Sequence, residues 1–388
     1  MAPPSRPEGS SAPRREREGS LAFFASAAKG TEAALGEELA ELGLHQVRKA
    51  RGGVHFRGPW EDAWCACLLS RIALRVLHPI AAFDAPDGAS LYEGVRDADW
   101  SPYLGARHTL AVSAVGGNEG LRNTQFVAQK TKDAIVDQIR DREGDRPSVD
   151  RVDPDLRVFV RLEGRRATAY VDLAGESLHR RGYREHVGGA PLKETLAAAL
   201  LRLAGYRGDR PLCDPLCGAG TIVIEAAQIA QGLAPGLLRR RFGFERWAQH
   251  DASAAERLRS LRARLAPAPG QGLEPLGSDS DPRALEATRH NASLAGARVR
   301  LERRPLASLA PSDPPGLVVT NPPYGQRLDL PPSLVPELRT ALRRLAGHRL
   351  ALLSFGPELE SAVGRRPDAT HELYNGDLLC KLLVYDLP

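Results

Sequence analysis

Long apolar segments are missing from this sequence. No run of eighteen or more apolar residues occurs among its 388 residues, although 42% of them are apolar, and this excludes a typical membrane-spanning helix. Residues 1–20 carry charges and prolines and contain no apolar stretch of the kind that a secretory signal needs. We therefore expect a cytoplasmic protein without a membrane partner, in which residues 1–20 are a disordered leader.

Cysteine is also scarce. The five cysteines are odd in number and irregularly spaced, which argues against a framework of disulfides. Cys65 and Cys67 lie two positions apart, and no second pair with the spacing of zinc ligands accompanies them. We predict that these two thiols are small buried hydrophobic groups and that the protein holds no metal.

The length and the order of the expected elements indicate several domains, because 388 residues exceed one ordinary core. Residues 21–80 alternate short strands with helices, including a helix over 31–42 with Thr31 as its N-cap, and predict a small α+β domain. Residues 81–175 predict a strand, a long helix over 124–140 and a hairpin of two strands that turns at residues 163–166.

From residue 176 to 388 helices and strands alternate in the manner of a doubly wound α/β domain. The C-terminal end of this domain gives the clearest prediction, because Asn375-Gly376 separates two segments in which apolar and polar residues alternate. That dipeptide favours a tight hairpin turn, so we expect an antiparallel hairpin to complete the sheet.

Positive charge is unevenly distributed. The net charge is only +5, but seven arginines fall between residues 157 and 184 against three acidic residues, and a second cluster covers 239–241. Such a concentration indicates a nucleic-acid surface, or alternatively a solvated face in a chain that prefers arginine to lysine.

The tetrapeptide Asn-Pro-Pro-Tyr occupies residues 321–324, directly after the apolar run Leu317 to Val319. Ligands bind open α/β sheets at such strand ends. The Asn321 side-chain carbonyl and the Pro322 main-chain carbonyl offer two acceptors for the two hydrogens of one amino group, and Tyr324 offers a flat face for a base. Held in this way, the amino nitrogen can be aimed at a methyl donor. The alternative is a rigid turn with a surface tyrosine.

A glycine turn follows an earlier expected strand, in Asp214-Pro215-Leu216-Cys217-Gly218-Ala219-Gly220-Thr221. It lacks the Gly-x-Gly-x-x-Gly spacing of dinucleotide sites and the Gly-Lys-Ser/Thr of Walker loops, so it predicts another cofactor or simply an ordinary strand-to-helix turn. One strand later, Asp279 stands where a ribose-binding carboxylate would be, and Asp281 precedes Pro282 as an N-cap.

These segments resemble a known family, the class I S-adenosylmethionine-dependent methyltransferases with a THUMP domain, and within it the RlmL-type 23S rRNA guanine-N2 methyltransferases. The likeness covers residues 21–388. Its motifs lie at 123–126, 132–137, 147–151, 172–184, 190–195, 214–221, 279–282 and 321–328.

The resemblance implies a Rossmann-like class I methyltransferase domain over 176–388, preceded by a ferredoxin-like domain over 21–80 and a THUMP RNA-binding domain over 81–175. It implies S-adenosylmethionine as cofactor and 23S rRNA, or an assembly intermediate of the large subunit, as partner. The target guanine would meet Asn321, Pro322 and Tyr324. The residues implied to bind the cofactor are Lys193, Thr195, Asp214, Cys217, Gly218, Gly220, Thr221 and Asp279. Those implied to bind RNA are Asn123, Lys130, Lys132, Arg180, Arg181 and Arg184.

Two departures from the family pattern qualify this expectation. Residues 303–306, Arg-Arg-Pro-Leu, replace a segment that usually carries an acidic residue for the adenine amino group, so we expect backbone and apolar contacts to hold the adenine. Some relatives carry a second methyltransferase domain, and we expect one modification activity here. The alternatives are an amino methyltransferase for tRNA guanine or DNA adenine, and a non-catalytic RNA-binding assembly factor.

Overall fold

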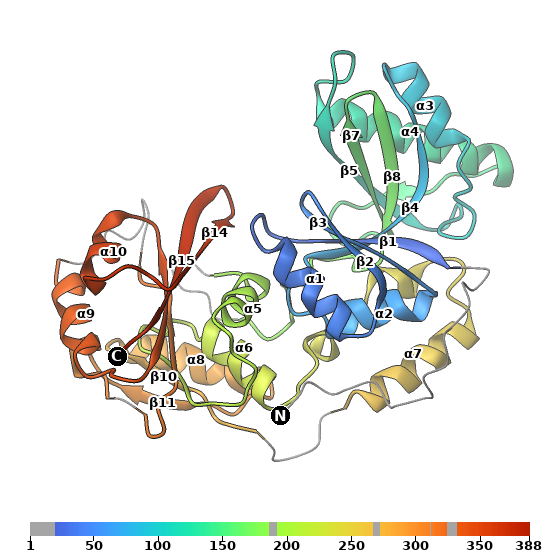
Figure 1. Cartoon of the computed structure of the whole chain (residues 1–388). Helices are drawn as coiled ribbons and strands as arrows, with labels where there is room; N and C mark the ends of the chain where they lie inside the picture. The colour runs from blue at the N-terminus through green and yellow to red at the C-terminus, as the bar shows by residue number, and fades with distance from the viewer. Residues whose placement is uncertain (1–19, 186–191, 267–271, 311, 324–331) are drawn as a thin grey trace.

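A computed structural model describes residues 20–185, 192–266, 272–310, 312–323 and 332–388. These residues form an eight-stranded sheet, here called sheet A, and a seven-stranded sheet, here called sheet B. Figure 1 shows the two sheets as separate parts of the molecule, with sheet A extending away from sheet B. None of the described helices is long and apolar enough to cross a membrane.

Sheet A has the strand order β2-β3-β1-β4-β8-β7-β5-β6. Its strands are β1 (Leu21–Ser26), β2 (His45–Ala50), β3 (Gly53–Gly58), β4 (Arg75–Asp84), β5 (Thr109–Gly117), β6 (Ser148–Val149), β7 (Leu156–Glu163) and β8 (Arg166–Asp172). We call β1–β3 with their helices the N-terminal lobe, and β5–β8 with theirs the middle lobe. The strand β4 pairs with β1 and with β8, so it joins the two lobes, and the boundary expected at residue 80 lies inside it.

In the N-terminal lobe the helices are α1 (Glu32–Glu41), close to the expected range 31–42, and α2 (Trp60–Leu69). Thr31 does occupy the N-cap position, but the prediction that its side chain caps the helix is wrong. The Thr31 hydroxyl donates to the Ala28 carbonyl at 2.7 Å and makes no side-chain cap to α1. The sequence identified the start of the helix but not which backbone group the hydroxyl would find.

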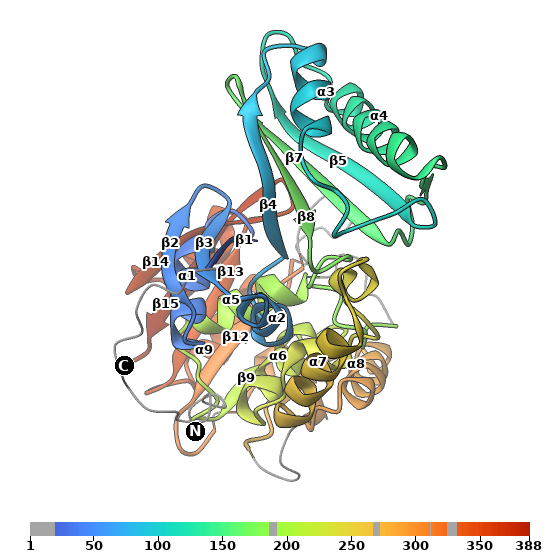
Figure 2. The ribbon, with the colours of Figure 1, turned by 90° about the vertical axis from the view of Figure 1, so that its right-hand side faces the viewer.

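In the middle lobe, α3 (Gly88–Arg96) and α4 (Thr124–Glu143) cover one face of the sheet (Figure 2). The expected hairpin is present, because β7 and β8 are antiparallel with Glu163 opposite Arg166. Along β7 every second residue from Leu156 to Leu162 is buried, which is the period-two pattern of a strand with one covered face.

Sheet B lies in the C-terminal lobe, which we define as residues 192–388, and has the order β11-β10-β9-β12-β13-β15-β14. The strands are β9 (Leu212–Asp214), β10 (Leu276–Asp279), β11 (Arg300–Arg303), β12 (Leu317–Thr320), β13 (Arg349–Ser354), β14 (Ala369–Asn375) and β15 (Leu378–Asp386). The strands β9 to β13 are parallel, whereas β15 is antiparallel to both β13 and β14. The expected doubly wound sheet with an antiparallel hairpin is confirmed.

Helices cover both faces of sheet B. They are α5 (Glu194–Leu203), α6 (Thr221–Ala230), α8 (Pro282–Leu294), α9 (Leu334–Leu342) and α10 (Pro357–Val363). In β12, Leu317 and Val319 pack in one apolar cluster with α5 and α6, while Val318 packs in another with α9 and α10. The expected buried strand before Asn321 therefore divides its side chains between two cores.

One segment of the C-terminal lobe packs on the N-terminal lobe instead of on sheet B. Residues 242–265, which include α7 (Ala252–Arg264), contribute Phe242, Phe244 and Trp247 to the core of sheet A. The rings of Phe244 and Trp64 stack with their centroids 5.4 Å apart. Sequence periodicity did not indicate this excursion, which places part of one lobe in the core of another.

Candidate functional site

The glycine turn connects β9 to α6 at the carboxyl edge of sheet B, as expected. Asp214 ends β9 and is 2% exposed, and its Oδ1 accepts from the Leu216 N–H at 3.2 Å. Burial raises the pKa of Asp214 to about 7; the Leu216 N–H opposes this rise, and the nearby charge of Asp279 adds to it. A carboxylate held in this way favours a positively charged ligand group at the turn.

The two glycines have the left-handed conformation that the turn requires, with φ of +54° at Gly218 and +86° at Gly220. A Cβ at Gly220 would lie 2.6 Å from Thr288 Cγ2, whereas a Cβ at Gly218 would meet nothing within 4 Å. Gly220 is therefore needed for packing against α8, and Gly218 leaves open space beside the turn. Cys217 is buried, and burial raises the pKa of its thiol.

Two residues of α8 hold the turn, and sequence reasoning missed both. Thr288 Oγ1 donates to the Gly218 carbonyl at 2.7 Å, and Asn291 Nδ2 donates to the Ala219 carbonyl at 3.1 Å. Both side chains are fully buried. The sequence does place these polar residues on the inner face of an expected helix, which could have marked them as structural. Their hydrogen-bond partners, however, lie about seventy positions earlier in the sequence.

Asp279 ends β10 and links the glycine turn to the next loop. Its Oδ2 accepts from the Gly218 N–H at 3.1 Å, and its Oδ1 accepts from the Asp281 N–H at 2.9 Å. Each carboxylate oxygen can accept a further hydrogen bond, so hydroxyl groups of a ribose fit here. Asp281 caps α8 through its Oδ1, which accepts from the Arg283 N–H at 2.9 Å, so the expected capping role is confirmed.

Arg184 connects the start of α5 to the start of α6. Its Nη2 donates to Thr221 Oγ1 and to the Leu192 carbonyl, each at 2.8 Å, and its Nε lies 3.0 Å from Glu194 Oε1. The predicted cofactor residues Lys193 and Thr195 therefore lie beside the glycine turn. Both of them line a cavity that also touches the N-terminal lobe.

Asn321 follows the last residue of β12, at the same edge as Asp214 and Asp279. Its Oδ1 is buried and has no hydrogen-bond partner among the described residues. Leaving such an acceptor unpaired costs about 1–3 kcal/mol, so the position is suited to a donor from a ligand. Pro322 is buried beside it, and Tyr324 lies outside the described residues.

The stretch predicted to meet the adenine follows β11. Arg304 N–H donates to the Asp279 carbonyl at 3.0 Å, and the Arg304 guanidinium pairs with Glu302 at 2.6 Å. Leu306 is buried in the cluster with α9. The described residues of this stretch thus offer an apolar side chain and backbone groups in place of the acidic residue that relatives usually carry. This arrangement is compatible with the expected adenine contacts.

The predicted RNA-binding residues separate into two groups. Arg181 is 2% exposed and paired with the buried Glu225, and it also donates to the Leu178 and Arg71 carbonyls. Arg184 is occupied at the glycine turn. We correct the prediction for Arg181, because an enclosed guanidinium with internal partners cannot reach a phosphate. The Arg184 side chain is 15% exposed, so its RNA contact stays a prediction. Arg180 is 66% exposed, and within the described part of the chain its ion-pair partner is Glu176 on the surface.

In the middle lobe, Asn123 caps α4, its Oδ1 accepting from the Gln125 and Phe126 N–H groups. Lys130 Nζ lies 5.2 Å from the ring centroid of Tyr92, and Lys132 pairs with the neighbouring Asp133. Both lysines are half-buried along α4. They remain predicted RNA contacts, whereas the Asn123 side chain already has a structural role.

Arg239 of the second arginine cluster is also structural. It is 7% exposed and donates to the carbonyls of Ala174, Glu176, Ser177 and Arg180. One guanidinium therefore fixes the segment that leaves the middle lobe. The sequence indicated a surface patch here because arginine is usually exposed, but its planar array of donors also suits several carbonyls at once.

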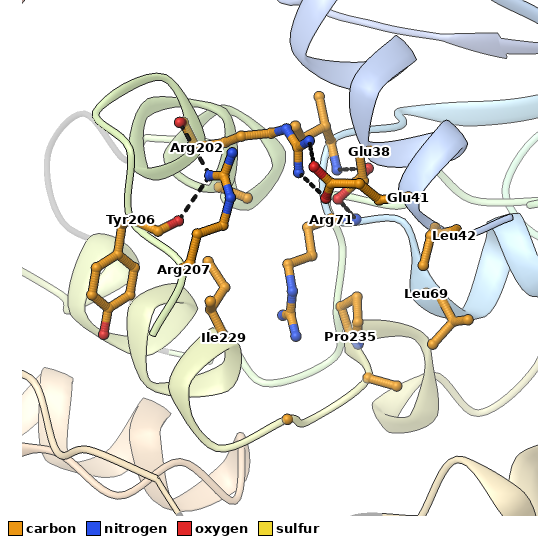
Figure 3. Close-up of a pocket in the computed structure, with 14 residues that line it drawn as sticks. Glu38, Glu41, Leu42, Leu69, Arg71, Arg202, Tyr206, Arg207, Ile229 and Pro235 are labelled. Carbon is orange, nitrogen blue, oxygen red and sulfur yellow. Dashed lines mark hydrogen bonds and ion pairs between the residues drawn. The ribbon is translucent and has the colours of Figure 1, made fainter. Parts of the chain in front are cut away.

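A cavity of about 90 Å³ lies at the seam between the N-terminal lobe and α5 and α6. Figure 3 shows Arg71 extending between Ile229 and Pro235, and Arg202 facing Glu41. Arg71 donates to the Gln228 and Leu233 carbonyls, and Arg202 pairs with Glu41 at 2.5 Å. None of the predicted site residues lines this cavity, and its polar groups join the two lobes.

Comparison with known proteins agrees with this architecture. A family model described as the RMKL-like methyltransferase domain (UPF0020) matches residues 181–383. The RlmL ferredoxin-like domain matches residues 22–77, and the THUMP domain matches residues 87–172.

Two relatives are named ribosomal RNA large subunit methyltransferase K/L. That of Methylococcus capsulatus is 43% identical over 94% of this chain and 51% of its own length. That of Syntrophotalea carbinolica is 42% identical over 95% of this chain and 54% of its own. The chain thus spans about half the length of these relatives.

Solved structures are similar over 95–96% of the chain. SMU.472, crystallised with SAH, superposes with a TM-score of 0.83 at 30% identity, covering 96% of this chain and 99% of the other. A protein of Listeria monocytogenes, described as a predicted N6-adenine-specific DNA methylase, gives 0.84 at 30% identity, covering 95% and 97%. TrmN from Thermus thermophilus, at 23% identity and a TM-score of 0.68, shares the fold. The chain belongs to the RMKL-like methyltransferase family.

Proposed function

We propose that the chain transfers a methyl group from S-adenosylmethionine to the exocyclic N2 of a guanine in 23S rRNA. The observation that carries this proposal is the buried Asn321 Oδ1, which has no donor among the described residues and lies at the carboxyl edge of a methyltransferase sheet. The names of the relatives support large-subunit rRNA as the substrate, and the THUMP match supports RNA. The proposed domains are residues 21–80, 81–175 and 176–388.

The residues at the glycine turn fit the cofactor. Asp214 would hold the amino group of its methionine part, the open space at Gly218 would admit it, and Asp279 would accept from its ribose hydroxyls. Lys193 and Thr195 are predicted to flank it. When bound, S-adenosylmethionine supplies a methyl group made electrophilic by the adjacent sulfonium.

The chain itself positions the nucleophile. The Asn321 side-chain carbonyl and the Pro322 main-chain carbonyl would accept the two hydrogens of the guanine amino group, which frees the nitrogen lone pair for attack. A stacked guanine hides this group, so the base must leave the helix at a cost of a few kcal/mol. RNA binding by the middle lobe would offset that cost.

Replacement of Asn321 by alanine tests the proposal. We expect Asn321→Ala to lower kcat for methyl transfer by about a hundredfold or more, as the loss of one positioned polar group does elsewhere. S-adenosylmethionine binding, measured by calorimetry, should stay within about twofold of the unsubstituted protein. A variant that keeps its activity, or that loses cofactor binding instead, would contradict the role given to Asn321.

The substrate is tested by supplying 23S rRNA, tRNA and DNA to the full chain with methyl-labelled cofactor, followed by digestion to nucleosides. We expect label in N2-methylguanosine from 23S rRNA. Label in tRNA guanine or in DNA adenine would select one of the other amino methyltransferase activities. Cofactor binding without transfer to any of these would favour an RNA-binding assembly factor.

A further inference from the structure

A second cavity, of about 390 Å³, opens between the N-terminal lobe and the carboxyl edge of sheet B. Ala28 and Lys29 form one wall, and Lys193 and Thr195, at the start of α5, form another. The third wall is the β14–β15 turn, residues 374–377. Because Ser354, the last residue of β13, pairs with Lys381, this turn extends past the edge where the parallel strands end.

Backbone contacts fix the two lobes against each other at this cavity. The Tyr374 N–H donates to the Lys29 carbonyl at 3.1 Å, and Lys29 Nζ lies 4.0 Å from the Tyr374 ring centroid. Gly30 has φ of +93°, and a Cβ there would lie 2.2 Å from the Glu372 carbonyl oxygen. Only glycine allows so close an approach, so the cavity wall is built by direct backbone packing.

The polar groups of the cavity suit an anion. Lys29 and Lys193 are exposed, and neither has an ion-pair partner among the described residues. Thr195 lies in the first turn of α5 and is 2% exposed, and its Oγ1 has no hydrogen-bond partner in the described structure. Helix starts attract anions, and Lys193 does not cap α5 with its side chain. Asp377 is the acidic residue of the lining, against two lysines.

The position of the cavity indicates which anion it receives. Arg184 connects the start of α5 to the glycine turn, so the cavity lies beside the proposed methyl-transfer site. We propose that it binds a backbone phosphate of the RNA next to the target nucleotide, with Lys29 and Lys193 as the cations and Thr195 as a donor. This inference rests on the proposed function and adds the N-terminal lobe to the RNA-binding surface.

Charge reversal at Lys29 tests the inference on the full chain. We expect Lys29→Glu to weaken binding of a 23S rRNA fragment about tenfold, the size of one lost charged hydrogen bond, and to reduce the slope of log affinity against log salt by about 0.7. Arg366→Glu is the matched control, because Arg366 is exposed in the segment before β14, at the opposite end of the hairpin. Its effect should be less than twofold.

Calorimetry with S-adenosylmethionine on Lys29→Glu separates this role from a cofactor role, because Lys29 lines the cavity and has no proposed contact with the cofactor. We expect the variant to weaken RNA binding while its Kd for S-adenosylmethionine stays unchanged. Loss of cofactor affinity with RNA affinity intact would assign the cavity to the cofactor and overturn the inference.

Methyl transfer by the unsubstituted protein separates the two proposals. If it methylates rRNA but Lys29→Glu and Arg366→Glu bind RNA equally, the phosphate site is refuted and the function stands. If Lys29→Glu selectively weakens RNA binding and no methyl transfer occurs, the function fails and the site stands.

Discussion

Ionisation of the buried Asp214 should make the free energy of unfolding depend on pH, and the substitution Asp214→Asn should remove this dependence. Its pKa rises from an ordinary value of 3.8 to about 7, chiefly through burial. Between these two values the folded protein binds a proton that the unfolded chain has lost, so stability falls as pH rises through this window and levels off above pH 7. Asn in place of Asp214 keeps the shape and abolishes this dependence.

The expected size follows from the linkage relation. From pH 5 to pH 7 the carboxylate costs the folded state about 1.36 kcal/mol per pH unit, or about 2.7 kcal/mol in total. The stability of Asp214→Asn relative to the unsubstituted protein should increase by that amount over this interval. For a domain of roughly 200 residues this corresponds to roughly 5–10 °C in the difference between the two Tm values.

Thermal unfolding of the cofactor-free proteins at pH 5, 6 and 7 measures this difference. Asp281→Asn is the control, because Asp281 is exposed, caps α8, and is replaced by an equally good capping residue. Its Tm difference should stay nearly constant with pH. A constant difference for Asp214→Asn as well would refute the argument that burial holds this carboxyl protonated.

Other substitutions test separate parts of the structure. Arg181→Met leaves Glu225 buried without its partner and should destabilise by about 3–5 kcal/mol in denaturant unfolding, whereas Arg181→Met with Glu225→Leu should recover most of the loss; equal loss in both would contradict the ion-pair argument. Gly30→Ala should loosen the contact with Glu372 and speed limited proteolysis between the lobes, and unchanged digestion would show that the contact is dispensable. Arg180→Ala should leave Tm within about 1 °C but weaken RNA binding, since its surface pair contributes little to stability; unchanged RNA affinity would remove it from the RNA surface.

The sequence alone determined most of the fold because its signals are local. The apolar run before Asn321, the glycine turn after Asp214 and the Asn375-Gly376 dipeptide each specify an element and its end. Parallel strands in turn place their carboxyl ends at one edge, so the order of the motifs along the chain was enough to group Asp214, Asp279 and Asn321. The hairpin direction and the capping of α8 by Asp281 followed from the same rules.

Only the tertiary structure decided which polar side chains reach solvent and which serve the fold. Arg180, Arg181 and Arg184 are nearly adjacent in sequence, yet the first is exposed, the second is enclosed and the third is part-buried. The difference arises because Arg181 and Arg184 pair with Glu225 on α6 and Glu194 on α5. The packing of α7 on the N-terminal lobe and the cavity beside Lys29 likewise bring together residues far apart in the chain. The periodicity of apolar residues indicates which face of a helix or strand is buried. It contains no information about which residues of another helix or strand will be in contact with that face.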